Sequence, residues 1–305
     1  MIVTEDPRVR SNSPKGDNVT IRNPIEWSVD QARDAAAALG STGAEWRRIE
    51  SERDIPVPAV ARIGIADLRA ALAKGYEDFA ANRTDVMLLC IFYPALGLVL
   101  GRIASGEDTL ALLFPLISGF ALVGPLAAVG LYEMSRRREM GAQIGWTDAF
   151  GVLRSPSLGP IVVLGLALTA LFVLWLIAAQ IIYMATLGPG HTATFGAFIH
   201  AVLDTRAGFA MIILGMGVGF GFALVVGILS VVSFPMLIDR DVGVGLALRT
   251  SVQAVAANPV TMAVWGLIVV VGLVLGSIPL FLGLVIVLPI LGHATWHLYR
   301  RLVPR

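Results

Sequence analysis

Residues 208–238 read GFAMIILGMGVGFGFALVVGILSVVSFPMLI, and no charged residue interrupts this run. A helix needs about 17–25 mostly apolar residues to cross the hydrocarbon core of a bilayer, and this run is long enough. Hydrocarbon offers no hydrogen-bonding partner for backbone N–H and C=O groups, so a chain that crosses it in a single run must be helical. The run therefore predicts one membrane-spanning helix.

Five further apolar runs lie at residues 86–101, 110–132, 158–184, 259–276 and 278–298. The chain of 305 residues is 56% apolar and 15% charged, with a mean hydropathy of +0.77, whereas a soluble domain carries about 25% charged residues. We therefore predict an all-α polytopic membrane protein with six transmembrane helices over residues 86–302. Before them we expect a disordered cytoplasmic tail at residues 1–26 and a cytoplasmic amphipathic helical segment at residues 27–85.

The positive charges predict the orientation of these helices. With six spans, 21 of the 23 Lys and Arg residues lie on the side that holds both ends of the chain, and only Arg102 and Arg206 lie on the other. Lys and Arg are retained on the cytoplasmic side, so we expect both termini in the cytoplasm. The formal net charge of +1 gives no reason to expect a nucleic-acid partner, and the single cysteine, Cys90, excludes an internal disulfide.

The chain also shows a threefold internal repeat. Three times an amphipathic stretch leads to a helix-stopping junction and then to two apolar runs; the junctions contain Asn82, Ser155-Pro156 and Asn258-Pro259, residues that end one helix and cap the next. We expect three parallel repeats of an interfacial amphipathic helix plus a transmembrane hairpin, although short loops in any membrane protein use the same residues. In the first stretch the apolar face contains Ile65, Leu68, Leu72, Tyr76 and Phe79, and the polar side contains Arg69, Lys74, Glu77 and Asp78.

Glycine is concentrated in the run at 208–238, at Gly215, Gly217, Gly219 and Gly221. Small residues let membrane helices approach each other closely, and this contact is a main source of cohesion between them. We therefore expect this helix to pack centrally in the bundle; a pliable gating helix is the alternative. The second run of each repeat carries a proline, which we expect to kink the helix: Pro125, Pro235 and Pro289.

The clearest polar feature is a histidine pair, His293 and His297, near the end of the last run. Their i, i+4 spacing places both rings on one helix face, as metal ligands require. A zinc site takes three or four ligands, so a metal or haem site would need a further group, for which Asp239 and Glu133 are candidates. The alternative is an interfacial belt, because headgroup regions attract the surrounding residue types: Trp296, Tyr299, Arg300 and Arg301.

Three motifs carry a resemblance to a known family: Gly75-Tyr-Glu-Asp-Phe79, Gly124-Pro-Leu-Ala-Ala-Val-Gly-Leu-Tyr-Glu133 and Phe234-Pro-Met-Leu-Ile-Asp239. Over about residues 60–302 the chain resembles a bacterial family of predicted integral membrane proteins of unknown function, domain of unknown function 2189. The resemblance implies a multi-pass protein of the bacterial inner membrane and implies no activity. Some members are labelled as cytochrome c oxidase subunit I, which needs six histidine ligands for two haems and a copper, whereas this chain has four histidines.

No Asp, Glu, Lys or Arg lies inside any of the six runs. Ion pumps and proton-coupled carriers keep ionisable groups there, and the motifs of soluble catalytic sites are missing. The leading hypothesis is therefore a non-enzymatic structural or accessory protein without a cofactor, which packs with membrane lipid or another inner-membrane complex. The alternatives are a facilitator of neutral or amphiphilic cargo, suggested by the glycines and prolines, and haem or metal handling at His293 and His297 linked to a respiratory oxidase.

Overall fold

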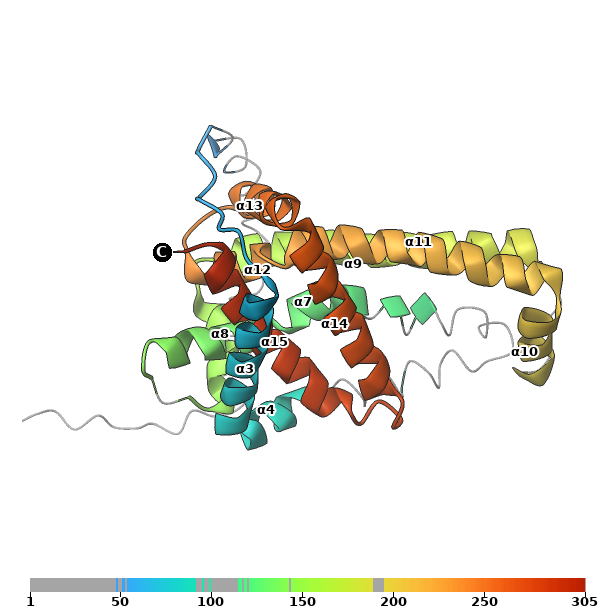
Figure 1. Cartoon of the computed structure of the whole chain (residues 1–305), viewed down its shortest axis with the longest axis horizontal. Helices are drawn as coiled ribbons and strands as arrows, with labels where there is room; N and C mark the ends of the chain where they lie inside the picture. Colours follow the sequence, from blue (N-terminus) through green and yellow to red (C-terminus); the bar gives the residue numbers. More distant parts are fainter. Residues whose placement is uncertain are drawn as a thin grey trace, which may run out of the picture.

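A computed structural model describes residues 48, 51–52, 54–91, 95, 99, 115–116, 118–119, 121–142, 144–188 and 195–304. These residues form helices and their connections, and no strand occurs among them. Two parts can be distinguished in Figure 1: an arm made of α9, α10 and α11, and a base from which the arm extends. The tail expected at residues 1–26 lies outside the described residues.

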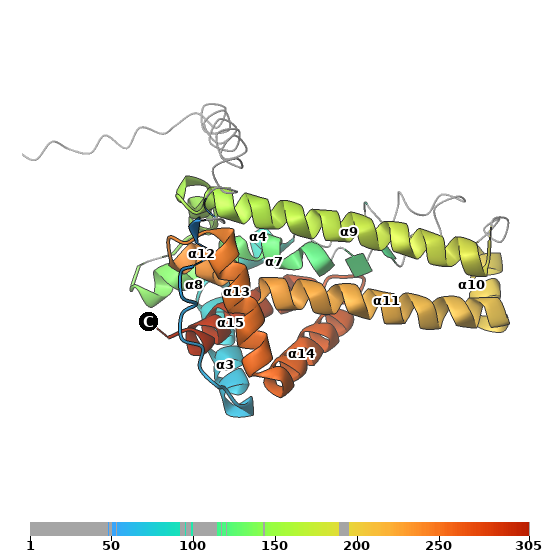
Figure 2. The ribbon, with the colours of Figure 1, turned by 90° about the horizontal axis from the view of Figure 1, so that it is seen from above.

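The arm is a pair of long apolar helices joined at its far end by a short one. α9 (Leu158–Thr186) and α11 (Arg206–Ser230) run side by side, and α10 (Phe195–Asp204) lies at the far end (Figures 1 and 2). At 1.5 Å per residue each long helix measures about 40 Å, more than the hydrocarbon core of about 30 Å. α11 begins where the Thr205 hydroxyl accepts the amide N–H of Gly208 at 2.9 Å.

The base consists of shorter helices around an apolar core. It contains α3 (Ile65–Ala81), α8 (Val129–Glu139), the 3₁₀ segment η2 (Trp146–Arg154), α12 (Ser233–Asp239), α13 (Val244–Ala257) and the second half of α15 (Leu284–Leu302). α3 and α13 run across the direction of the arm (Figures 1 and 2), the arrangement expected of helices that lie flat on a membrane surface. The innermost side chains of the base are fully buried: Phe234, Met236, Trp296, Tyr299 and Leu302.

A second, shorter hairpin leaves the base beside the arm. It is formed by α14 (Pro259–Ser277) and the first half of α15. α14 is inclined to α11, and the turn between α14 and α15 lies well short of α10 in both views (Figures 1 and 2). The remaining described elements are α4 (Arg83–Cys90), the 3₁₀ segment η1 (Ala121–Val123) and α7 (Gly124–Ala127).

Three described stretches are long and apolar enough to cross a membrane: α9, Arg206–Asp239 (α11 together with α12), and α14. They correspond to the predicted spans at 158–184, 208–238 and 259–276. The predicted spans at 86–101 and 110–132 lie mostly outside the described residues. The predicted span at 278–298 differs from the structure, because its helix begins at Leu284 and its second half is packed inside the base.

Helices change at all three predicted junctions. α3 gives way to α4 at Asn82, η2 ends at Ser155 shortly before α9, and α13 gives way to α14 at Asn258. The Asn258 side chain also accepts the amide N–H of Ile63 at 2.8 Å and donates to the carbonyl of Ala61 at 3.0 Å, which fixes the segment before α3. The internal repeat stays a prediction, because much of its first unit lies outside the described residues.

The stretch Arg206–Asp239 is interrupted between α11 and α12. The Ser251 hydroxyl of α13 donates to the carbonyl of Ile228 at 2.6 Å and accepts the amide N–H of Val232 at 3.2 Å. In an unbroken helix these two backbone groups would bond to each other, so the hydroxyl is inserted into the helix ladder. Pro235, predicted to cause the kink, lies just beyond this interruption.

The two other prolines have different positions. Pro125 stands in the first turn of α7, directly after η1, so it accompanies a break in the predicted span at 110–132. The first turn of a helix tolerates proline because its N–H groups have no partner within the helix. Pro289 lies inside α15, which continues through it.

The central packing predicted for the helix at 208–238 is wrong. Only 6% of the most apolar window of Arg206–Asp239 is buried, against 28% for α9. A Cβ atom at Gly215, Gly217 or Gly221 would meet no described residue within 4 Å, and only Gly219 faces a neighbour, with Trp175 at 3.0 Å. Among the described residues, most of the glycine-rich surface of this helix has no neighbour.

Candidate functional site

The close packing of α3 on α15 brings the polar residues of the base together. Leu68, Ala71 and Gly75 lie on the buried side of α3. At Gly75 the two helices approach so closely that a Cβ atom would lie 2.6 Å from the amide nitrogen of Ala294. One turn further along α3, Asp78 is buried beside the histidine pair of α15.

The Asp78 carboxylate is the centre of a buried hydrogen-bond network. Its Oδ2 accepts the Ser135 hydroxyl of α8 at 2.6 Å and lies 2.8 Å from Nε2 of His297. Its Oδ1 pairs with Nε of Arg138 at 3.2 Å, and Ser135 Oγ lies 2.7 Å from Nδ1 of His293. Burial raises the pKa of the Asp78 carboxyl, but the hydrogen bonds from His297 and Ser135 outweigh it, so the net pKa is below its ordinary value.

The network determines where the protons lie. An ionised carboxylate can only accept hydrogen bonds, so Ser135 donates its one hydroxyl hydrogen to Asp78. His293 Nδ1 must then donate to Ser135 Oγ. Nε2 of His293 is buried and has no hydrogen-bond partner among the described residues, which favours the neutral imidazole with Nε2 unprotonated. The network therefore orients this ring and leaves one of its nitrogens unsatisfied.

Ser, His and Asp are also the residue types of a hydrolase triad, but their arrangement differs. In a triad the carboxylate orients the histidine, and the histidine takes the proton of the serine. In this chain Asp78 bonds directly to Ser135, and Ser135 is 1% exposed. A buried hydroxyl whose hydrogen is held by a carboxylate is not placed to attack a substrate. The geometry is that of a buried hydrogen-bond network that joins α3, α8 and α15.

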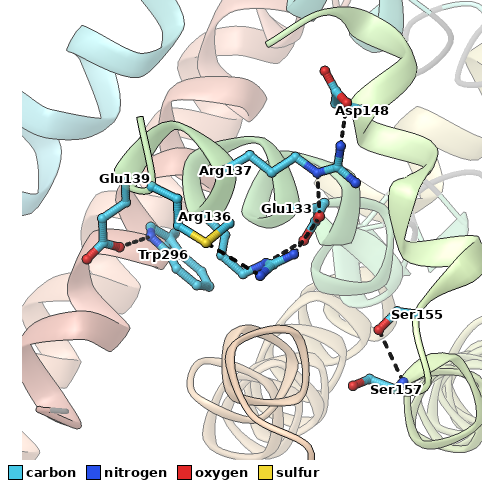
Figure 3. Close-up of polar contacts among 9 residues, drawn as sticks. Glu133, Arg136, Arg137, Glu139, Asp148, Ser155, Ser157 and Trp296 are labelled. Carbon is cyan, nitrogen blue, oxygen red and sulfur yellow. Dashed lines mark hydrogen bonds and ion pairs between the residues drawn. The ribbon is translucent and has the colours of Figure 1, made fainter. Parts of the chain in front are cut away.

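A second polar cluster starts from α8 and leads to η2. Glu133 is buried, and two guanidinium groups converge on its carboxylate (Figure 3). Arg136 binds both oxygens at 2.7 and 2.8 Å, and Arg137 binds Oε1 at 2.6 Å and continues to Asp148 of η2 at 2.5 Å. The hydrogen bonds to Glu133 raise the pKa of Arg136. Arg136 therefore stays charged, and Arg137 ties α8 to η2.

Two further carboxylates hold the C-terminal half of α15. Glu139, at the end of α8, accepts the indole N–H of Trp296 at 3.1 Å (Figure 3) and the guanidinium of Arg300 at 3.1 Å. Asp239, at the end of α12, accepts the hydroxyl of Tyr299 at 2.8 Å and Arg300 at 3.2 Å. Burial is the main cause that raises the pKa of Tyr299. This half of α15 is thus bonded to α3, α8 and α12.

The structure places His293 and His297 in this network. Neither Asp239 nor Glu133, the proposed further ligands, bonds to them, since both carboxylates are engaged with other residues. Among the described residues, no three or more His, Cys, Asp or Glu side chains are grouped so that they could hold a metal ion. Metal or haem binding by the pair stays a prediction.

The interfacial belt is wrong for its two aromatic residues. Trp296 and Tyr299 are fully buried, because their polar atoms bond to carboxylates inside the base. Arg301 pairs with Asp67 of α3. The amide of Gly64 and this arginine together lower the pKa of the Asp67 carboxyl, so this carboxylate stays charged at neutral pH.

Ser135 was not predicted as a site residue, and Asp78 was expected on the polar side of its helix. The predicted apolar face is also wrong at Ile65 and Tyr76, which are exposed. The buried face of α3 can instead be recognised from small residues at steps of three or four, which are typical of close contacts between helices. The buried face of α3 follows this spacing: Leu68, Ala71, Gly75 and Asp78.

An open pocket of about 420 Å³ lies between α8 and α12, lined by Arg136, Met140, Asp239 and Arg240. Arg136 is bonded to Glu133, and Arg240 Nε lies 3.7 Å from an oxygen of Asp239. The positive charges are therefore largely compensated. The pocket is a polar recess in the base, at the end of the apolar stretch Arg206–Asp239.

Polar side chains on the apolar helices turn back to their own backbones. Thr169 and Thr186 of α9 donate to the carbonyls of Gly165 and Ile182 at 2.9 and 2.7 Å. Ser277 of α14 donates to the carbonyl four residues earlier at 2.8 Å. These hydroxyls are not offered to a cargo, so the facilitator hypothesis gains no site from them and stays a prediction.

The comparisons with known proteins bear on the arm and on part of the base. No curated protein and no solved structure matches the chain. One family model matches residues 113–239, a segment that includes α8 to α12 and two of the three motifs that carry the resemblance. The cytochrome oxidase label of some members gains no support from this match. That model is described as predicted integral membrane protein, domain of unknown function 2189, so residues 113–239 are similar to this family.

Proposed function

We propose that the protein is a non-enzymatic structural or accessory protein of the bacterial inner membrane, which packs through its arm against lipid or another membrane complex. The observation that carries this proposal is the uncovered apolar surface of the arm. Only 6% of the most apolar window of Arg206–Asp239 is buried by the chain itself. Contiguous exposed apolar surface of this kind marks a contact with membrane or protein. On α11 it includes Phe209, Ile213, Met216 and Phe220.

The base serves as the anchor of this arm on the cytoplasmic side. Its helices are joined by carboxylates that bond across elements, as Asp78, Glu139 and Asp239 do. Such a bonded base holds the arm in a fixed direction. Most Lys and Arg residues of the sequence lie in or beside the base, and this distribution favours the cytoplasmic side for it.

Photo-crosslinking in native membranes tests the proposal. A photoreactive phenylalanine replaces Phe220 in the arm, and a matched variant carries the same group at Asp54, which is exposed beside the base. We expect lipid adducts, or one reproducible protein adduct, at position 220 and neither at position 54. Native mass spectrometry after extraction in mild detergent should find retained lipid or a bound partner. A solitary monomer without lipid, together with equal crosslinking at both positions, would overturn the proposal.

A further inference from the structure

We infer that the α14–α15 hairpin is re-entrant: it enters the membrane from the side of the base, and its turn ends among the acyl chains of the bilayer without reaching the opposite aqueous side. This inference rests on the proposed packing of the chain in lipid and goes beyond it. The hairpin is formed by α14, the turn at 278–283 and the first half of α15.

The turn has the composition of a segment that avoids water. It reads Ile-Pro-Leu-Phe-Leu-Gly over residues 278–283 and contains no polar side chain. Ile278, Leu280 and Leu282 are 72%, 72% and 62% exposed, so the chain itself does not cover them. The far end of the arm provides the contrast, because it carries charge at Asp204 and Arg206, as a connection in water does.

Most amide N–H groups of the turn are paired without water. Four of its amide N–H groups donate to carbonyls within the hairpin at 2.9–3.2 Å: Ile278 to Val274, Leu280 to Ile278, Phe281 to Ser277, and Leu282 to Pro279. Pro279 has no amide hydrogen to satisfy. Hydrocarbon requires such internal pairing, whereas a turn in water can leave these groups to solvent.

Two residues of the turn adopt a conformation that L-residues rarely use. Leu280 and Phe281 have φ values of 50° and 64°, in the left-handed region that favours glycine. Leu280 and Phe281 are also two of the internal donors. A turn in water would usually place glycine or asparagine at such positions, so apolar side chains are kept at the tip despite the backbone cost.

The length of α15 fixes how deep the hairpin can reach. His293 is held in the base by Ser135, and α15 begins at Leu284, nine residues earlier. Nine residues of helix span about 14 Å, roughly half of the 30 Å hydrocarbon core. α14 is inclined to the arm, and the turn lies well short of α10 (Figures 1 and 2). Both observations limit the tip to about the middle of the bilayer at most.

Spin labels in proteoliposomes test the inference. Cys90 is replaced by Ala, and single cysteines are introduced as Leu280→Cys at the tip, Phe220→Cys on the arm and His200→Cys on α10; all three native side chains are exposed. Collision rates with oxygen, which concentrates in hydrocarbon, and with a water-soluble nickel chelate are measured at each site. We expect position 280 to match position 220, with high oxygen and low nickel accessibility, and position 200 to show several-fold more contact with nickel.

Two other outcomes would overturn the inference, and a third would contradict the proposed function. Nickel accessibility at position 280 equal to that at position 200 would show that the hairpin tip lies in water, and low accessibility to both reagents would show that protein covers it; either result overturns the inference. A water-exposed position 220 would instead contradict the packing of the arm in lipid. The proposed function and the re-entrant hairpin therefore fail in distinguishable ways.

Discussion

Gly75 of α3 lies against Ala294 of α15, and a Cβ atom at position 75 would come within 2.6 Å of the Ala294 amide nitrogen and 2.7 Å of its Cβ. The atoms in the way include backbone, which cannot rotate aside. Asp78 lies one turn further along the same face, bonded to Ser135 and to His297. The close approach of the two helices and the polar network beside it therefore depend on each other.

Replacing Gly75 by alanine should separate α3 from α15. Overpacking of a tight contact costs about 1–3 kcal/mol, and we expect this loss in the free energy of unfolding measured in mild detergent. The control is Gly266→Ala in α14, where a Cβ would meet no described residue within 4 Å; this change should be neutral or slightly stabilising. Equal stabilities of the two variants would show that the contact is looser than described.

Replacing Asp78 by asparagine should destabilise the protein and change its response to acid. The folded pKa of Asp78 lies below its unfolded value, which is about 3.9. The stability that the ionised group contributes is therefore present above about pH 4 and is lost as the pH falls through the folded pKa. At neutral pH the variant leaves Arg138 and His297 without their carboxylate, for a loss of about 3 kcal/mol.

The pH profile of the melting temperature between pH 7 and 3 checks this prediction. The wild-type curve should fall below about pH 4, and the curve of Asp78→Asn should start lower and fall less. Asp54→Asn, at an exposed position, is the matched control and should follow the wild type. If the curves of wild type and Asp78→Asn ran parallel, Asp78 would not contribute to the loss of stability in acid.

Removing divalent metals should leave the protein unchanged. The rings of His293 and His297 are oriented by Ser135 and Asp78, and among the described residues no three or more His, Cys, Asp or Glu side chains are grouped to hold a metal ion. We expect the same melting temperature with a chelator and with added zinc, and no haem absorbance in purified protein. Stoichiometric metal or haem that disappears in the His293→Ala, His297→Ala double variant would instead establish the cofactor site.

Ser251 should stabilise the interruption between α11 and α12. Its hydroxyl bonds to both backbone groups that the interruption separates, Ile228 C=O and Val232 N–H, so Ser251→Ala leaves them buried without a partner. We expect a loss of about 1–3 kcal/mol in unfolding free energy. Ser277→Ala removes a hydroxyl that bonds only to the carbonyl of Leu273 on its own helix and should cost clearly less. If both variants lose the same stability, the inserted hydroxyl has no special role.

The sequence predicted much of the helical architecture. Hydropathy identified α9, α11 and α14, because a charge-free run of this length has no other stable form in lipid. Asn82, Ser155 and Asn258 marked helix ends correctly, since capping depends on local backbone groups. The depth of the last hairpin was not predictable from hydropathy, which counts apolar residues and does not record that His293 is held inside the base.

The site was only partly predictable for a similar reason. The i, i+4 spacing identified His293 and His297, but their partners come from α3 and α8, far away in the sequence. Periodicity placed Asp78 with the solvated charges, because hydropathy assigns every carboxylate to the polar side of a helix. For Gly215, Gly217 and Gly221 the sequence predicted close helix contacts that no described residue makes. Small residues permit close packing, but they do not supply the neighbouring helix.

We propose that the arm crosses the membrane and that the base lies in the cytoplasm, and side-specific cysteine labelling distinguishes the two sides. In a Cys90→Ala background, His200→Cys on α10 and Glu77→Cys on α3 replace exposed residues at opposite ends of the molecule. A membrane-impermeant maleimide applied to spheroplasts should label position 200 at once and position 77 only after the membrane is permeabilised. Labelling of both positions in sealed spheroplasts, or of position 77 alone, would contradict the account.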